Sequence, residues 1–326
     1  MVYCKKTKGD EHLQYIITNE QSGMTVRSFL QQFLKPSTKM LKHLKYREDG
    51  IRVNGAHCTV RKILSEGDVL ELALTDSEAS DRIAPVELPI EILYEDDDLV
   101  VPSKPADMPT HPSHGHYDDT VANALAFRYA KQGTPFVFRP INRLDRNTSG
   151  LLLVARNKLS AGRLTHSLDT GRIRKSYLAI LDGEMTEQEG VIDACLHRTA
   201  ESIIVREVCS PDAPDADAAR TEYRVLAVQN GHTLVLAHPI TGRTHQLRVH
   251  FAHLGHPITG DDLYGTVTPL IPRHALHAVS LTFPHPATDC DMRLTAPLPS
   301  DFSALAEQLF PDLLIESELR KAVTNS

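Results

Sequence analysis

The apolar positions in the first quarter of the chain predict a small α+β unit. Their spacing predicts a helix over residues 29–34 and a second helix over residues 40–46, separated by a helix-ending proline. Residues 51–53 form a predicted strand that enters the Asn54-Gly55 turn, a strong signal for a β-hairpin. Another strand is expected over residues 69–72. Together these elements indicate a compact unit with two helices and a small sheet.

Beyond residue 90, predicted strands and helices mix without a repeating strand–helix–strand order. The alternation over residues 175–181 is typical of a strand and places Lys175 and Tyr177 on one face. This order indicates an α+β fold with a mixed, mainly antiparallel central sheet. The other expected elements are strands over residues 99–101, 150–156 (buried), 202–208, 221–229 and 233–238, and helices around residues 164–168 and 247–254.

The composition is that of an ordinary globular protein. Of the 326 residues, 41% are hydrophobic and 24% are charged, and this length favours one large domain with one smaller domain. No apolar run approaches the ~18 residues of a transmembrane helix, and the start lacks the apolar stretch of a signal peptide. The five cysteines are scattered and form no C-x-x-C pair, which favours reduced thiols. We therefore expect a cytoplasmic protein with no membrane partner.

Charge is distributed unevenly along the chain. The net charge is −7, which argues against indiscriminate coating of nucleic acid. Residues 23–74, however, contain nine basic and five acidic residues, a balance of +4, so the rest of the chain carries −11. Much of that acid lies in residues 75–98. A basic unit beside an acidic stretch indicates a polyanionic partner.

The densest polar cluster is Arg143-Leu144-Asp145-Arg146-Asn147-Thr148-Ser149-Gly150, directly before a predicted buried strand. Asp145 should ionise easily, because the arginines on either side favour its anionic form. An ionised carboxylate in a cleft can act as a nucleophile. Taken alone, the same residues also fit a loop carboxylate that is salt-bridged to its neighbours.

A second polar cluster, residues 239–248 (PITGRTHQLR), is an expected anion site. Gly242 permits a tight loop, Thr244 can cap the following helix, and Arg243 would lie near the start of that helix. The anion could be a phosphate or a carboxylate of the protein itself. The alternative is an ordinary capped helix with surface arginines.

Histidines gather in two places, at residues 111–116 and at His245, His250, His253 and His256. The second group contains no H-E-x-x-H motif and no recognised zinc spacing. We therefore expect no metal site there, and the first group is expected to be a polar loop.

The motifs taken together resemble those of the RluA-type RNA pseudouridine synthases over roughly residues 88–300. The two helices, the hairpin and the strand of residues 23–74 resemble an S4-type RNA-binding domain, a common companion in that family. The matching segments, in chain order, are Lys104-Pro105-Ala106, Arg143-Leu144-Asp145 with Thr148-Ser149-Gly150, Lys175-Ser176-Tyr177, residues 241–248, Gly255-His256-Pro257 with Gly260-Asp261, and Ala275-Leu276-His277-Ala278 leading to Phe283.

This resemblance implies the domain organisation and the reaction. It implies a pseudouridine synthase fold, with an S4-like domain and N-terminal extension in residues 1–75, a linker in 76–89 and the catalytic domain in 90–326. A uridine in RNA would be isomerised, so that its glycosidic C–N bond becomes a C–C bond. The resemblance implies no cofactor and no metal.

It also implies roles for individual residues. Asp145 would be the catalytic carboxylate, Tyr177 would pack on the uracil and accept or relay a proton, and Arg243 would pair with Asp145 and keep it ionised. The target base has to leave the RNA stack, and Arg143 would enter the vacated space. Asp145, Arg243 and Tyr177 are therefore expected to converge around the extruded nucleoside.

RNA is the expected partner, with ribosomal RNA favoured and transfer RNA second, and the protein is expected to be a monomer. Phosphate contacts from the S4-like unit would position the RNA without reading its sequence. The residues expected to make them are Lys39, Lys42, Lys45 and Arg52.

Two positions depart from the family pattern. Asn142 stands where the family often has histidine, which keeps hydrogen bonding but loses titration. Asp107 replaces a frequent glycine and adds negative charge near the RNA groove. These departures leave open a non-catalytic RNA-binding or ribosome-assembly protein on the same fold. A metallohydrolase that uses the histidines near His250 is a third hypothesis.

Overall fold

The computed structural model describes residues 4–5, 13–34, 38–73, 83–315 and 317–319, and the side chains of Cys4, Lys5, Thr38, Lys39 and His43 are not among those described. The N-terminal unit is a five-stranded antiparallel sheet covered by helices. Its strand order is β1-β2-β5-β3-β4. The elements are β1 (Cys4–Lys5), β2 (Leu13–Ile16), α1 (Val26–Phe29), a π-helical stretch (Leu30–Leu34), α2 (Thr38–Tyr46), β3 (Ile51–Val53), β4 (Ala56–His57) and β5 (Val69–Leu72).

The small core of this unit explains the apolar spacing of its sequence. Phe29, Leu44 and Leu70 are fully buried and belong to one cluster. The Asn54-Gly55 turn joins β3 to β4 as expected, with positive φ at both residues, as a tight two-residue hairpin requires. The expected helices and strands of this region are thus confirmed.

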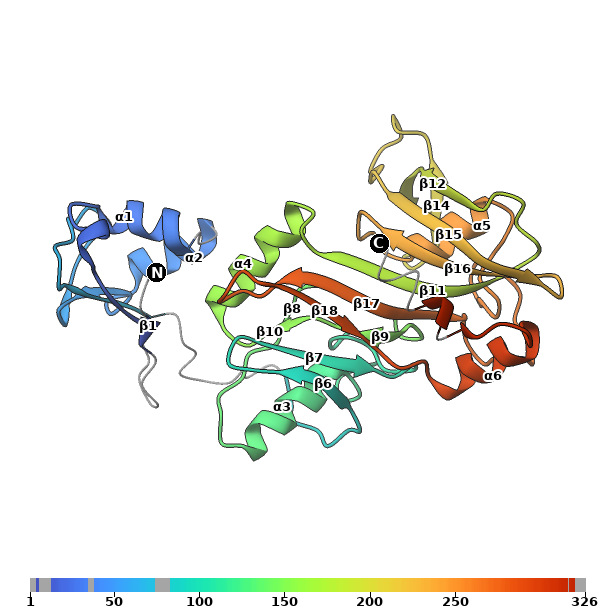
Figure 1. Cartoon of the computed structure of the whole chain (residues 1–326), viewed down its shortest axis with the longest axis horizontal. Coiled ribbons are helices and arrows are strands. Elements are labelled where there is room, and N and C mark those ends of the chain that lie inside the picture. The colour runs from blue at the N-terminus through green and yellow to red at the C-terminus, as the bar shows by residue number, and fades with distance from the viewer. Residues whose placement is uncertain (1–3, 6–12, 35–37, 74–82, 316, 320–326) are drawn as a thin grey trace.

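An eleven-stranded sheet forms the body of the protein, with all pairs antiparallel except β17 with β9 (Figure 1). Its main order is β12-β15-β16-β11-β17-β9-β7-β10-β8; β18 pairs with β17, and β6 with β7. The strands are β6 (Glu91–Glu95), β7 (Leu99–Lys104), β8 (Arg139–Pro140), β9 (Ser149–Leu151), β10 (Val154–Ala155), β11 (Arg174–Asp182), β12 (Glu189–Asp193), β15 (Arg220–Gln229), β16 (His232–Pro239), β17 (Leu276–Pro284) and β18 (Asp291–Thr295). A separate hairpin pairs β13 (Cys195–Arg198) with β14 (Arg206–Cys209).

Helices cover both faces of this sheet, which accounts for its continuously apolar central strands. In β7, Val100 packs in the cluster that contains α3 and α6, whereas Leu99 and Val101 pack in the cluster that contains α4. The helices are α3 (Val121–Lys131), α4 (Lys158–Asp169), α5 (Gln246–His253) and α6 (Ser300–Leu309). The predicted α+β class with a mixed, mainly antiparallel sheet is confirmed.

Two expected strands are corrected by the structure. The run expected over residues 150–156 is interrupted at Leu152 and Leu153, so that β9 pairs with β17 while β10 pairs with β8. Both interrupting residues are buried, which explains why hydrophobicity alone predicted one strand. The strand expected over residues 202–208 is confined to β14.

The N-terminal unit lies at one end of the molecule and touches the body through α4 (Figure 1). Leu159 of α4 packs in the N-terminal core cluster, and Arg163 donates a hydrogen bond to the carbonyl of Phe33 at 2.9 Å. The expected linker, residues 76–89, lies partly outside the described residues; at its described end, Ala84 accepts a hydrogen bond from Asn123 of α3 at 2.8 Å.

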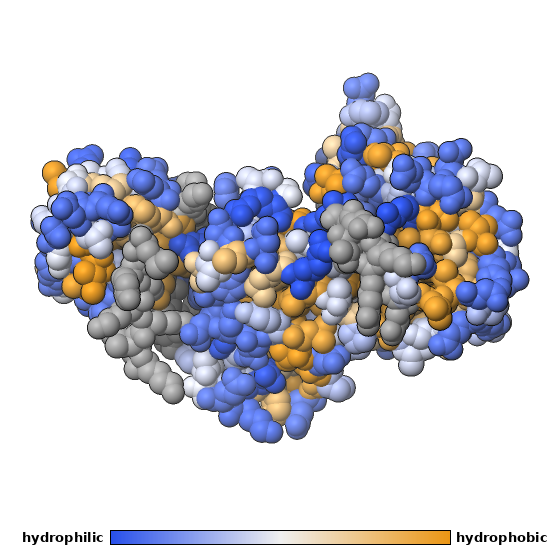
Figure 2. Space-filling model, in the orientation of Figure 1, coloured by the Kyte–Doolittle hydropathy of each residue, from blue (hydrophilic) through white to orange (hydrophobic). Residues whose placement is uncertain are grey.

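The surface in Figure 2 is mostly hydrophilic, with smaller apolar areas on the body. No helix in the described part of the chain is long and apolar enough to cross a membrane.

Gly150 in β9 is the glycine that the sheet most clearly requires. Its φ is +112°. A Cβ placed there would overlap the backbone carbonyl of Ala278 on β17, the strand that pairs with β9. We expect Gly150→Ala to lower the free energy of unfolding by about 3 kcal/mol or more, because neither strand can shift without breaking the ladder. Urea denaturation measures this loss.

Gly133→Ala is the matched control, since Gly133 has φ +66° but nothing within 4 Å of its Cβ position. It should cost only about 1 kcal/mol, the cost of left-handed backbone strain. Equal losses in the two variants would contradict the close contact between β9 and β17.

Candidate active site: a groove around Asp145

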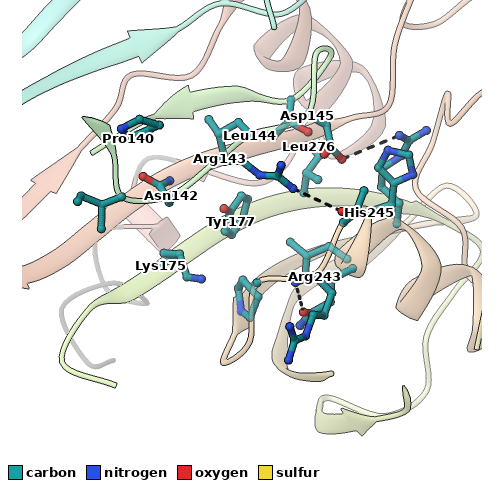
Figure 3. A pocket seen from close by; sticks show the side chains of 18 of the residues that line it. Pro140, Asn142, Arg143, Leu144, Asp145, Lys175, Tyr177, Arg243, His245 and Leu276 are labelled. Carbon is teal, nitrogen blue, oxygen red and sulfur yellow. Dashed lines mark hydrogen bonds and ion pairs between the residues drawn. The ribbon is translucent and has the colours of Figure 1, made fainter. Parts of the chain in front are cut away.

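A groove of about 380 Å³ opens at the junction of three segments that lie far apart in the sequence. The Asp145 loop before β9 forms one side, β11 contributes Lys175 and Tyr177, and the loop before α5 contributes the other side (Figure 3). The two polar clusters of the sequence therefore face the same cavity. Lys175 and Tyr177 line it together, which confirms that they share a face of the strand.

Arg248 is the cation that faces Asp145. Its guanidinium lies 4.0 Å from the Asp145 carboxylate, and its side chain is only 4% exposed. Arg248 is held by Asp261, to which it donates two hydrogen bonds of 2.7 and 2.6 Å, and by Asp262 at 2.9 Å. Burial alone would lower the pKa of Arg248, but the bonds to Asp261 raise it overall, so the residue is a fixed positive charge.

The expected ion pair between Arg243 and Asp145 is wrong. Arg243 lines the groove, but its guanidinium pairs with Asp217 at 3.2 Å and donates to the carbonyl of Ala218 at 3.1 Å. Arg243 is an exposed residue of the loop, and Asp217 is the carboxylate within its reach. The arginine that faces Asp145 is Arg248, which is buried and lies on the following helix, α5.

Thr244 does not cap α5, contrary to expectation. His245 precedes the helix in a left-handed conformation with φ +57°, and the turn is closed by Gln246. The side-chain Oε1 atom of Gln246 accepts hydrogen bonds from the hydroxyl of Thr241 at 2.7 Å and from the backbone N–H of Arg243 at 3.0 Å. Hydrogen bonds within the loop therefore close the turn, and Thr244 lines the groove.

Tyr177 lies on the floor of the groove and is 7% exposed. Burial raises the pKa of its phenol well above the usual range, and the negative charge of Asp145 raises it further. The phenol is therefore protonated at neutral pH, and it offers the groove a flat apolar ring with a hydrogen-bond donor.

Lys104 holds the Asp145 loop through hydrogen bonds to backbone carbonyls. Its ammonium is buried and donates to the carbonyls of Pro105 and Met108 at 2.7 Å and of Arg146 at 2.8 Å. Burial lowers the pKa of Lys104 to about 7, although the nearby charge of Asp145 opposes the shift. The sequence motif that begins at Lys104 is thus a support for the loop.

Two buried histidines complete this support. His274 Nε2 lies 2.8 Å from the hydroxyl of Thr148, and His277 Nδ1 lies 2.9 Å from the hydroxyl of Ser149. Burial lowers the pKa of each histidine to about 3, and nearby arginines add to the shift. Both rings are therefore neutral, and the loop from Asp145 to Ser149 rests on uncharged hydrogen bonds.

The two departures from the family pattern fit the loop structurally. Asp107 has φ +59°, a conformation that explains a frequent glycine, and it forms an ion pair with Arg146 at 2.5 Å that offsets its charge. Asn142 accepts a hydrogen bond from the backbone N–H of Leu153 at 2.8 Å, so it holds the loop to the sheet.

The expected RNA-binding residues occupy different places. Arg143 is exposed and lines the groove, where it donates to the hydroxyl of Thr244 at 3.5 Å. Lys42 and Lys45 are exposed on α2, and Arg52 is half-buried on β3. The side chain of Lys39 lies outside the described part of the structure. The structure thus gathers Arg143 with Asp145, whereas the others belong to the N-terminal unit.

The histidines that could suggest a metal are engaged elsewhere. His250 donates to the carbonyl of Ala194 at 3.2 Å and accepts from the hydroxyl of Thr221 at 2.9 Å. Within the described residues, the group of possible metal ligands is Asp96, Asp98 and His285. Asp96 already accepts hydrogen bonds from the backbone N–H groups of Asp98 and Leu99 and from the side chain of His285. These bonds stabilise the turn between β6 and β7.

Comparison with known proteins shows which family the chain belongs to. Residues 98–253 match the model of the RNA pseudouridylate synthase family. The uncharacterized RNA pseudouridine synthase YjbO of Bacillus subtilis is 36% identical over 282 residues, which cover 86% of this chain and 98% of that protein. The ribosomal large subunit pseudouridine synthase D of Vibrio cholerae is 35% identical over 279 residues, 81% and 85% of the two chains.

A solved structure agrees. The human RNA pseudouridylate synthase domain containing 1 superposes with a TM-score of 0.55 at 31% identity, covering 66% of this chain and 87% of that one. The chain therefore belongs to the RNA pseudouridine synthase family. It is an RluA-type RNA pseudouridine synthase, an isomerase, and the expected pseudouridine synthase fold is confirmed.

The neutral histidines predict acid sensitivity. In the unfolded chain His274 and His277 would protonate near pH 6.5, whereas in the folded protein their pKa values are about 3. The unfolded state therefore binds more protons below pH 6.5, so stability is greatest above that pH and falls toward pH 3. Between pH 7 and pH 5 each histidine should remove roughly 2 kcal/mol from the free energy of unfolding.

Urea denaturation at both pH values checks this expectation. His274→Asn should lose about 2 kcal/mol less than the wild type over the same interval, whatever its stability at pH 7. His253→Asn, on the end of α5, is the control and should keep the wild-type pH dependence. An unchanged pH dependence in His274→Asn would contradict a neutral buried ring.

Proposed function

We propose that the protein converts specific uridines of structured RNA to pseudouridine, with Asp145 as the catalytic carboxylate and ribosomal RNA as the favoured substrate. The observation that carries this proposal is the meeting of Asp145, Arg248 and Tyr177 in one groove. A carboxylate, a fixed cation that faces it, and an aromatic side chain are groups that suit an extruded nucleoside.

The reaction breaks the bond between N1 of uracil and C1′ of the ribose, and forms a bond between C5 and C1′ in its place. The detached base turns within the site, the proton on C5 leaves, and N1 gains a proton, so the overall composition is unchanged. Positive charge develops at C1′ as the first bond breaks. Asp145 would stabilise or trap that centre because it is anionic, half-buried and on the groove surface.

Tyr177 and Arg143 would accommodate the base and the gap that it leaves. The ring of Tyr177 gives the uracil a stacking surface, and its raised pKa favours packing and hydrogen-bond donation over proton abstraction. Arg143 is exposed at the groove edge, where a planar guanidinium can stack on neighbouring bases.

Arg248 would be the positioning residue for the carboxylate, and Arg243 would contact RNA at the rim. Arg248 is anchored by Asp261 and cannot follow the ligand, whereas Arg243 is exposed. These two proposed roles replace the expectation that Arg243 orients Asp145.

Ribosomal RNA is favoured on two grounds. The Vibrio cholerae relative, which matches along most of both chains, is named for the large ribosomal subunit. The basic N-terminal unit presents Lys42 and Lys45 to solvent, where they can contact phosphates of a folded RNA.

We expect Asp145→Asn to abolish isomerisation, with a loss of at least about a thousandfold in kcat, while RNA binding and folding persist. Release of tritium from RNA labelled at C5 of uridine measures the reaction, with large-subunit ribosomal RNA and transfer RNA as parallel substrates. Asp291→Asn, at an exposed position of the edge strand β18, is the control.

Full turnover by Asp145→Asn would contradict the catalytic assignment. Wild-type protein that binds both RNAs but produces pseudouridine in neither would instead favour the non-catalytic RNA-binding protein. Turnover on transfer RNA alone would contradict the substrate preference.

The two arginines predict unequal effects. Arg248→Lys removes the guanidinium that both Asp261 and Asp145 face, so kcat should fall by about a hundredfold or more. Arg243→Lys keeps the charge at an exposed position and should change kcat by less than about threefold. Single-turnover rates with saturating enzyme give the comparison, and urea denaturation verifies that both variants fold. The reverse order would return the positioning role to Arg243.

A further inference from the structure

Lys175 is a buried cation without a partner in the described structure. Its side chain is 8% exposed, it lies on β11 two residues before Tyr177, and it lines the groove (Figure 3). Among the described residues, no hydrogen bond or ion pair involves its ammonium, and burial is the cause that lowers its pKa, with no carboxylate to oppose it.

The other buried cations near the groove are all compensated. Lys104 donates to three backbone carbonyls, Arg248 pairs with Asp261, and Arg273 pairs with Asp301 at 2.7 Å. An unpaired buried ammonium lowers stability unless something neutralises it. The exception at Lys175 therefore points to a partner that arrives with the ligand.

Gly242 leaves this ammonium open to the groove. A Cβ at Gly242 would lie 3.6 Å from the Lys175 Nζ atom. Gly242 is not among the residues with positive φ, so its backbone conformation does not require glycine. What the glycine provides is space, because even a Cβ there would be in van der Waals contact with the nitrogen of Lys175.

Asp145 and Lys175, two groove residues of opposite charge, lie apart from each other, while Arg143 is exposed at the groove edge. The Asp145 carboxylate lies at one end, Tyr177 lies in the middle, and Lys175 projects toward the Gly242 loop at the other end (Figure 3). A nucleotide has the complementary arrangement, because its sugar is uncharged and becomes cationic during the reaction, whereas its phosphate is an anion.

We propose that Lys175 binds a backbone phosphate of the RNA beside the target nucleoside, through the opening at Gly242. This inference rests on the proposed function, because it places the sugar at Asp145 and the base on Tyr177. A lysine ammonium suits this role as a compact point charge that needs no fixed hydrogen-bond geometry. The neutralised pair would form only in the complex.

The salt dependence of RNA binding tests the proposal. Lys175→Met keeps the length of the side chain and removes its charge. The slope of log Kd against log salt should become shallower by about 0.7–0.9, as expected for one lost phosphate contact, and Kd at 50 mM salt should rise about tenfold. Lys175→Arg should keep the wild-type slope. Lys131→Met, at an exposed position at the end of α3, is the matched control and should match the wild type.

A second measurement covers the free protein. Because the ammonium has no partner in the described part of the chain, Lys175→Met should be at least as stable as the wild type to urea, whereas removal of a structurally paired lysine would destabilise the protein. A clear loss of stability in Lys175→Met would overturn the proposal.

The possible outcomes separate this inference from the proposed function. An active wild type with an unchanged salt slope in Lys175→Met overturns the phosphate site alone. A fall in kcat with an unchanged slope would assign Lys175 to the base and also overturns it. Wild-type protein that forms no pseudouridine contradicts the proposed function, which the binding slopes do not measure.

Discussion

The buried pair of Arg248 and Asp261 is the interaction on which the geometry of the groove depends. Arg248 extends from α5, and Asp261 follows the loop after that helix, so the pair holds α5 and its preceding loop against the sheet. Asp261 is fully buried and also accepts hydrogen bonds from the backbone N–H groups of Leu263 and Tyr264 at 3.0 Å. A pair of this kind is costly to break, because each partner would leave an uncompensated buried charge.

This pairing also determines how Arg248 acts on Asp145. The guanidinium makes its short hydrogen bonds to Asp261 and stays 4.0 Å from Asp145. Asp145 therefore lies in the positive field of Arg248 without a short bidentate bond that would occupy its oxygens. A carboxylate proposed to react with a ribose needs oxygens that are free to approach the sugar.

Some features of the site could be predicted from sequence because they depend on local periodicity. The two-residue repeat of a strand places Lys175 and Tyr177 on one face, and the structure has them in one cavity. The choice between Arg243 and Arg248 depends on contacts between distant segments. Asp217 pairs with Arg243 and Asp261 pairs with Arg248, and neither carboxylate lies within the motif of residues 239–248.

The fold likewise has features that depend on local sequence and features that depend on contacts between distant segments. The hairpin at Asn54-Gly55 follows from its turn residues. The break between β9 and β10 could not be predicted, because its residues are as apolar as the strands that they separate, and it depends on a parallel pairing with β17 over a hundred residues later. Asp107 lies between these two cases. Its left-handed conformation explains why the family often has glycine there, whereas its ion pair with Arg146 could not be predicted from the sequence.

An acidic protein can bind RNA because charge acts locally. Exposed charges are screened beyond a Debye length of about 8–10 Å at physiological salt, so the net charge of −7 has little influence inside the groove. Near the groove, Asp107, Asp217 and Asp261 each neutralise an arginine of the chain, and these pairs present little net field to a ligand. Among the described groove residues, the Asp145 carboxylate stays 4.0 Å from Arg248, and Lys175 and Arg143 have no carboxylate partner. The groove thus offers a carboxylate at Asp145, a buried ammonium at Lys175 beyond the ring of Tyr177, and a guanidinium at its edge in Arg143, and the separation of Asp145 from Lys175 is what would orient a nucleotide within it.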